Sequence, residues 1–75
     1  VIKKEFWREV ESFMRRLSKL EREVFQLRFM DHLGIAEISV VLGRGESTVK
    51  THLYRAVKKF QTEEHLIGLI RGVEP

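Results

Sequence analysis

Apolar residues recur at three- and four-residue steps along most of the chain. The first series predicts an amphipathic helix over residues 3–16, with an apolar stripe made of Ile2, Phe6, Val10, Phe13, Met14 and Leu17. A second series predicts the next helix, with these residues facing inward: Leu20, Val24, Leu27 and either Phe29 or Met30. The chain has no alternating strand pattern and no repeat, so we expect an all-α fold.

Capping and breaking residues mark where these helices begin and end. Ser18 and Glu21 form a Ser-x-x-Glu capping box, because the hydroxyl can accept from the Glu21 amide and the carboxylate from the Ser18 amide. Residues 31–34 interrupt the pattern before a short helix over residues 35–42. Residues 43–45, Gly-Arg-Gly, predict a tight break, where glycine adopts positive φ without steric cost, and a longer helix opens near Glu46.

The last part of the chain is less regular. The pattern falters at residues 62–64 and resumes at Leu66, Ile67, Leu69 and Ile70, which predict a fifth helix or a continuation of the fourth. Residues 72–75 are expected to fray. We expect these four to five helices to form one domain over residues 1–75. Its predicted core packs Val49, Leu53, Val57 and Phe60 against Val24, Leu27, Ile38 and Leu42.

Residues 35–61 have the spacing of a helix-turn-helix motif, a short helix followed by a turn and a longer helix. A wheel with about 100° per residue places Leu53, Ala56 and Phe60 within about 40° of Val49, on the face that enters the core. The rest of the helix offers hydroxyls, an aromatic ring and cations, which bind phosphates and base edges. The candidate DNA-binding residues are Ser47, Thr48, Lys50, Thr51, Tyr54, Arg55 and Lys58.

The placement of charge supports this interpretation. The net charge is +3, and residues 44–59 contain five basic residues against one acidic residue. Residues 47–62 contain no acid at all. An ordinary surface helix usually mixes acids with bases for ion pairs one turn apart. The absence of acids therefore favours a phosphate-facing surface over a merely solvated helix face.

The composition argues against several other classes of protein. Without cysteine the chain forms no disulfide and no thiolate metal site, and its three histidines have no second ligand at metal spacing. Residues 43–48 lack the Gly-Lys-Ser/Thr ending of a phosphate loop and follow no strand. A chain of 75 residues also leaves little room for a catalytic cleft. We therefore expect no enzyme, no cofactor, no metal and no membrane span.

Several pieces of the chain resemble region 4 of bacterial sigma factors, most closely the extracytoplasmic-function subgroup. They are residues 17–29, residues 37–38, residues 42–43 and residues 48–56, which contain Thr-Val-Lys-x-x-Leu-x-Arg-Ala. The resemblance implies a domain of the winged-helix-like DNA-binding superfamily, without a wing. It implies that Lys50, Thr51, Tyr54 and Arg55 face the −35 promoter element in the major groove.

The resemblance also implies partners and a location. It implies a cytoplasmic domain that binds double-stranded promoter DNA and docks on the flap region of the RNA polymerase core to direct transcription initiation. An anti-sigma factor is a further implied partner.

Two alternatives stay open at this stage. The quorum-regulator (LuxR-type) DNA-binding domain of response regulators also uses Thr-Val-Lys-x-His-Leu. The 14-residue step from Glu23 to Glu37 matches sigma region 4, whereas the LuxR-type step is usually one residue shorter. The other alternative is a protein-interaction module whose surface uses Phe6, Trp7, Phe13, Met14 and the apolar tail. A domain this small needs such residues for its core, which favours burial.

The chain departs from the sigma pattern in and beside the helix-turn-helix. Residues 34–36 replace a polar cap, which weakens any phosphate contact from that helix start, and Ser39 replaces a usual alanine. Val40 is apolar where an exposed acid is common. Residues 44–46 replace a more apolar turn, and Glu46 would be mildly repulsive near DNA. These departures leave the binding register open and allow for specialisation toward a protein partner.

Overall fold

The computed structural model describes residues 4–72, which form five α-helices and no strand. α1 covers Lys4–Arg16, α2 Lys19–Phe29, α3 Ile35–Leu42, α4 Glu46–Gln61 and α5 Glu64–Gly72. The all-α prediction is confirmed, and the tail forms a helix separate from α4. Fraying is expected from residue 72, but Gly72 is the last residue of α5; Ile2 and residues 73–75 lie outside the described residues, and the side chains of Leu69 and Ile70 are not described either.

Local hydrogen bonds set the ends of α2. The Ser18 hydroxyl accepts from the Glu21 amide at 3.2 Å, and the Glu21 carboxylate accepts from the Ser18 amide at 3.0 Å, so the predicted capping box is confirmed. After α2 the chain turns through His32, whose φ of 59° lies in the left-handed region. The Leu33 amide donates to the Leu27 carbonyl at 2.9 Å, and Arg28 Nη1 donates to the Leu33 carbonyl at 3.1 Å. These bonds redirect the chain into α3.

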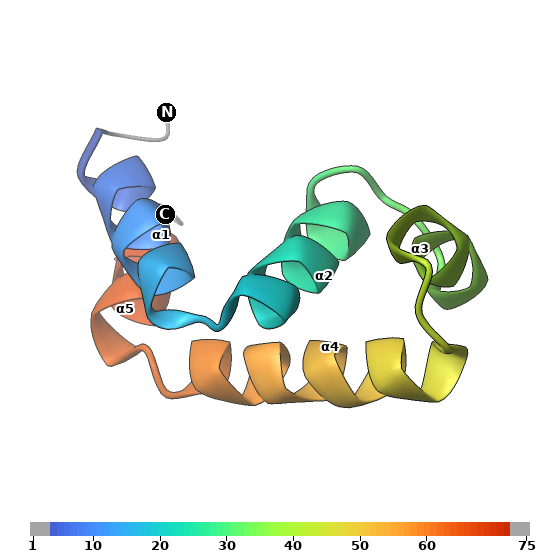
Figure 1. Ribbon diagram of the computed structural model, residues 1–75. Helices are drawn as coiled ribbons and strands as arrows, with labels where there is room; N and C mark the ends of the chain where they lie inside the picture. Colours follow the sequence, from blue (N-terminus) through green and yellow to red (C-terminus); the bar gives the residue numbers. More distant parts are fainter. Residues whose placement is uncertain (1–3, 73–75) are drawn as a thin grey trace.

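The helices enclose two hydrophobic clusters, and α4, which runs below α2 and α3 in Figure 1, contributes residues to both clusters. The aliphatic cluster joins α2, α3 and the first half of α4. Its buried residues are Val24, Ile38 and Val49, flanked by Leu20, Leu27, Leu33, Ile35, Leu42 and Leu53. The aromatic cluster joins α1, α5 and the second half of α4, with one ring, that of Phe25, from α2. Its buried residues are Phe13, Met14, Leu17, Ala56 and Leu66, flanked by Phe6, Val10, Phe25 and Phe60.

The predicted core is correct for the first half of α4 and wrong for its second half. Val49 is buried, and Leu53 packs beside it against the aliphatic cluster. Phe60 instead belongs to the aromatic cluster, with its ring centroid 5.5 Å from that of Phe13. Val57 is only half-buried. The reason is geometric: α4 has sixteen residues, and the side chains of its second half join those of α1 and α5 in the aromatic cluster.

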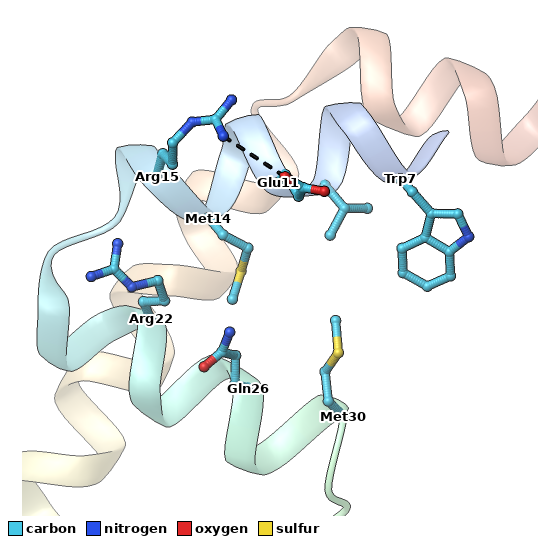
Figure 2. Close-up of a pocket in the computed structure, with 8 residues that line it drawn as sticks. Trp7, Glu11, Met14, Arg15, Arg22, Gln26 and Met30 are labelled. Atoms are coloured by element: carbon cyan, nitrogen blue, oxygen red, sulfur yellow. Dashed lines mark ion pairs between the residues drawn. The ribbon is translucent and has the colours of Figure 1, made fainter. Parts of the chain in front are cut away.

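Phe29 and Met30 are not turned into the core as expected, and they expose 49% and 48% of their surface. α2 separates two grooves, and these residues lie on opposite sides of it. Phe29 lines a groove shared with α4, and Met30 lines a groove shared with α1 (Figure 2). The expectation that one of them faces inward is therefore wrong, because periodicity does not say which elements lie beside the end of α2.

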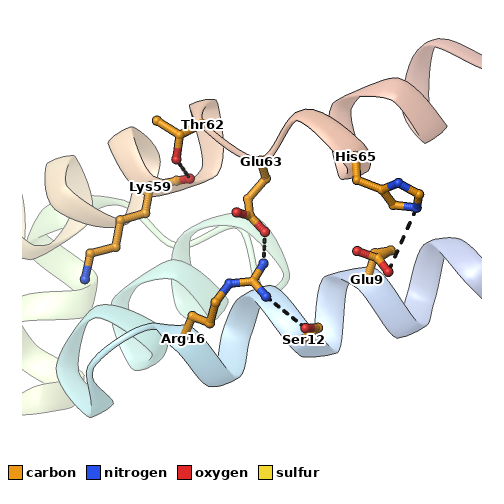
Figure 3. A network of polar contacts seen from close by, with 7 residues as sticks. All are labelled: Glu9, Ser12, Arg16, Lys59, Thr62, Glu63 and His65. Carbon is orange, nitrogen blue, oxygen red and sulfur yellow. Dashed lines mark hydrogen bonds and ion pairs between the residues drawn. The ribbon is translucent and has the colours of Figure 1, made fainter.

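α1 and α5 lie side by side and are tied by polar contacts (Figure 3). Arg16 pairs with Glu63, just before α5, and also donates to the Ser12 hydroxyl at 3.0 Å. His65 Nε2 lies 3.7 Å from the Glu5 carboxylate and 4.0 Å from that of Glu9. Beneath these contacts the buried side chain of Leu66 reaches the aromatic cluster. α5 is thus the element that holds α1 onto the end of the molecule.

A buried carboxylate connects the start of α2 to the end of α4. Glu21 exposes only 4% of its surface, and its Oε1 accepts from Lys59 Nζ at 2.7 Å. Burial by itself raises the pKa of Glu21, but the hydrogen bond and charge of Lys59 and the bond from the Ser18 amide outweigh it, so its pKa lies below the ordinary value. One side chain therefore serves both as a helix cap and as half of an ion pair.

Candidate nucleic-acid interface

The turn between α3 and α4 sets the direction of the longer helix. Gly43 has φ 63°, in the left-handed region, and a Cβ placed there would meet nothing within 4 Å. Backbone conformation rather than space therefore requires glycine at this position. The Arg44 amide donates to the Ser39 carbonyl at 3.1 Å, and the Ser39 hydroxyl donates back to the Arg44 carbonyl. The serine that departs from the sigma pattern thus fastens the turn.

The wheel's division of α4 agrees with the structure. Val49 and Ala56 are fully buried on the inner face. On the outer face the structure exposes six of the seven candidate residues, and only Thr48 is half-buried; the exposed six are Ser47, Lys50, Thr51, Tyr54, Arg55 and Lys58. Over more than two turns the helix therefore offers a continuous surface of hydroxyls, cations and one phenol.

The cations of this surface are not neutralised from within the molecule. Within residues 4–72, Lys50, Arg55 and Lys58 take part in no ion pair. Lys58 Nζ lies 5.6 Å from the centroid of the Tyr54 ring, close enough for a weak cation–π contact at a ring that is 64% exposed. The positive charge is therefore available to an external anion, and Lys58 helps to order the aromatic ring beside it.

Lys59 behaves differently from its neighbour Lys58. The count of basic residues in the sequence included Lys59 in the phosphate-facing segment. In the structure it points toward α2 and pairs with Glu21 (Figure 3 shows it directed away from α5). Sequence reasoning missed this because the two residues are 38 positions apart. The positive surface of α4 is thus one charge smaller than the sequence indicated.

His52 is fixed by its own helix. Its Nδ1 lies 2.8 Å from the Thr48 carbonyl oxygen, and a carbonyl only accepts, so Nδ1 carries a proton. In the neutral ring Nε2 is then an acceptor. The half-buried ring is therefore held against its own helix through Nδ1.

The start of α3 is occupied by a carboxylate. Glu37 Oε1 accepts from the Gly34 amide at 2.8 Å and caps the helix. A phosphate approaching this helix start would meet that negative charge. The geometry agrees with the expectation that the residues before α3 contribute little to phosphate binding.

A second feature of this part of the molecule is apolar. Phe25 and Phe29 of α2 and Val57 and Phe60 of α4, together with Gln61, line an open groove of about 460 Å³. We call it the α2–α4 groove. Sequence reasoning missed it, because the interaction surface it considered used apolar residues of α1 and of the tail. Phe13, Met14 and Leu66 are in fact buried, whereas Trp7 is exposed. Four apolar side chains around one open groove are typical of a surface that binds a protein.

Residues 4–72 contain no group of three histidine or acidic side chains placed to hold a metal ion. No helix within these residues is long and apolar enough to cross a membrane.

Comparisons with known proteins point to one class. The family model described as sigma-70, region 4, matches residues 7–60, which include α1 to α4 apart from their outermost residues and leave α5 outside. The extracytoplasmic-function RNA polymerase sigma factor BldN of Streptomyces coelicolor is 42% identical over 45 residues, 60% of this chain. The alignment spans 17% of the length of that relative. No solved structure matches the chain.

Proposed function

The chain belongs to the sigma-70 region 4 family, and from that premise we propose that it reads the −35 element of a promoter and docks on the RNA polymerase core to direct transcription initiation. As a member of this family it is a promoter-recognition domain of a bacterial transcription factor. The observation that carries the finer proposal is the outer face of α4, which is exposed, cationic and free of acids from Ser47 to Lys58.

Within this face we assign different roles to two cations. The planar fork of Arg55 suits bidentate hydrogen bonding to guanine O6 and N7. Lys58 is a point charge that suits a phosphate, and Tyr54 suits a thymine methyl or a sugar. We assign phosphate contacts near the start of the helix to Ser47 and Thr48, and contacts with the base edges to Lys50 and Thr51.

The polymerase contact is assigned to the α2–α4 groove. Its lining residues come from α2 and α4, and none of them is among the seven candidate DNA-binding residues. A partner helix with an apolar stripe could therefore bind there without displacing DNA. An anti-sigma factor that covered the same groove would block polymerase binding. Because promoter DNA and polymerase are cytoplasmic in bacteria, the proposal also assigns the domain to the cytoplasm.

The test compares Arg55→Ala with Lys58→Ala in fluorescence-anisotropy titrations of this chain bound to core polymerase. A preferred −35 duplex is first selected from a randomised library, and a scrambled duplex is the control. Arg55→Ala should lose about 1–3 kcal/mol on the preferred duplex and much less on the scrambled one. Lys58→Ala should weaken binding to both duplexes alike. It should also reduce the slope of log affinity against log salt concentration by about one.

The outcomes separate the parts of the proposal. If the two variants behave identically on both duplexes, Arg55 does not read bases. Phe29→Asp should weaken capture of core polymerase by about tenfold or more while leaving DNA binding of the isolated chain unchanged. If Phe29→Asp abolishes a protein contact and neither α4 variant affects DNA binding, the domain is a protein-interaction module and the promoter proposal fails.

A further inference from the structure

The groove on the other side of α2 belongs to neither surface described so far. It lies between α1 and α2 and has a volume of about 280 Å³. Figure 2 shows Trp7 and Met14 reaching it from α1 and Arg22, Gln26 and Met30 from α2 or its C-terminal end. We call it the α1–α2 groove. It shares no lining residue with the α2–α4 groove.

Apolar side chains face this groove without closing it. Trp7 remains 47% exposed and Met30 48% exposed, although they reach the same hollow from different helices, and buried Met14 adds a second methionine to its wall. α1 packs against α5, and its inner face joins the aromatic cluster, where Phe13 contacts Phe25 of α2 on the side away from this groove. Large apolar side chains that face one hollow and stay half-exposed are typical of a helix-binding groove, and methionines adapt to varied partners.

The charge at one end of the groove indicates which kind of partner fits. Arg15 and Arg22 stand at the end opposite Trp7 (Figure 2). Arg15 has a partner in Glu11, at 3.8 Å between two exposed side chains. Arg22 takes part in no ion pair within the described range of the chain. The groove therefore combines an apolar wall with one uncompensated cation.

We propose that the α1–α2 groove binds an amphipathic helix of an acidic protein partner, whose apolar side chains insert between Trp7 and Met30 and whose carboxylate pairs with Arg22. The Gln26 amide lies between these two parts and can bond to polar atoms of the incoming helix. The site is separate from the promoter face of α4 and from the α2–α4 groove. A partner bound here leaves both of those surfaces uncovered.

Trp7 makes the proposal directly measurable, because it is the only tryptophan of the chain and lies in the groove. The probe is a stapled helical peptide with leucines at positions i, i+3, i+4 and i+7 and one flanking glutamate. A matched peptide carries lysine in place of that glutamate. The glutamate peptide should shift Trp7 emission to shorter wavelength and saturate, because binding removes the indole from water. The lysine peptide should bind about fivefold more weakly, as an attraction becomes a repulsion at a partly exposed pair.

Variants of the chain assign the binding to this groove. Arg22→Glu should reverse the preference between the two peptides, and Met30→Asp should abolish the emission shift. Both positions lie on the surface side of α2, and circular dichroism checks that the helices are intact. Val57→Asp, in the α2–α4 groove, is the control and should leave the titration unchanged.

Three results would overturn the proposal. One is an unchanged Trp7 spectrum at peptide concentrations of about 1 mM, the weakest affinity that would still count as binding. Another is equal affinity of the chain for the two peptides, unchanged in Arg22→Glu. This result would show that the groove does not select an acidic partner. The third is loss of binding in Val57→Asp but not in Met30→Asp, which would assign the peptide to the other groove.

Discussion

The two hydrophobic clusters of this small domain are built in different ways. The aliphatic cluster joins elements that follow one another in the sequence, and its geometry comes from a capped helix start, a glycine turn and small branched side chains. The aromatic cluster joins the beginning and the end of the chain. Edge-on aromatic rings and polar ties between distant residues hold it together. The first cluster positions the outer face of α4, and the second closes the molecule behind it.

Removing a central ring should have the largest effect. Phe13 is buried and contacts Phe25 and Phe60 edge-on, with centroid distances of 5.5 Å in both cases. We expect Phe13→Ala to lower the free energy of unfolding by about 3–5 kcal/mol in urea denaturation. The matching change in the aliphatic cluster, Ile38→Ala, should cost about 2–5 kcal/mol.

The two substitutions should differ in what they do to DNA binding. Under conditions where both variants remain folded, Phe13→Ala should retain the affinity of α4 for duplex DNA, whereas Ile38→Ala should weaken it because α4 loses its support. Equal losses of DNA affinity in the two variants would show that the aliphatic cluster does not support the outer face of α4 more than the aromatic cluster does.

The buried Glu21 connects the two regions, and its removal should have an intermediate effect. Glu21→Gln keeps the shape of the side chain but removes the charge that pairs with Lys59. We expect a loss of about 1–3 kcal/mol at neutral pH, the range for hydrogen bonds to charged groups. Lys59→Met, which removes the other partner, is the matched variant.

The same pair should make stability depend on pH. The folded-state pKa of Glu21 lies below its unfolded value, so its contribution is complete above the unfolded pKa of about 4.3 and is lost as the pH falls through the folded pKa. The stability difference between the wild type and Glu21→Gln should therefore shrink with acidification. A difference that stays constant from neutral pH to below pH 4, a range that spans the unfolded pKa of about 4.3, would contradict this account.

The smallest effect is expected in the turn before α4, where two glycines act differently. Gly43 has positive φ, whereas Gly45 has an ordinary φ of −67° and caps α4 without a side-chain hydrogen bond. Gly43→Ser should destabilise the chain by about 1 kcal/mol. Gly45→Ser supplies the missing cap oxygen and should stabilise it by about 0.3 kcal/mol. Thermal unfolding of the two variants measures both changes in stability. If both variants were stabilised, or both destabilised, this account of the turn would be contradicted.

The contrast between the clusters also explains what the sequence could predict. Ser18, Glu21, Gly43 and the bounds of α3 follow from local chemistry, because caps, glycine turns and helical periods depend on residues within one or two turns. The outer face of α4 can likewise be predicted from a helical wheel. These features cover the helix-turn-helix and most of the candidate DNA-binding surface.

The remaining features depend on contacts between distant parts of the chain. The sequence does not reveal that Lys59 reaches back to Glu21, or that Phe60 packs on Phe13 instead of the aliphatic cluster. Met30 continues the three- and four-residue step from Leu27, yet whether it or Phe29 is buried depends on which elements lie beside the end of α2. Both apolar grooves arise in this way, so periodicity alone could not locate them.

The central claim is that the outer face of α4 binds duplex DNA while α1 and α5 serve as support. The most direct test follows backbone amide NMR signals of the chain during titration with duplex DNA at low and high salt. We predict signal changes concentrated in residues 46–58, small changes in α1 and α5, and reversal of the changes as salt rises. Changes centred on α1 or α5, or binding that does not respond to salt, would contradict the account.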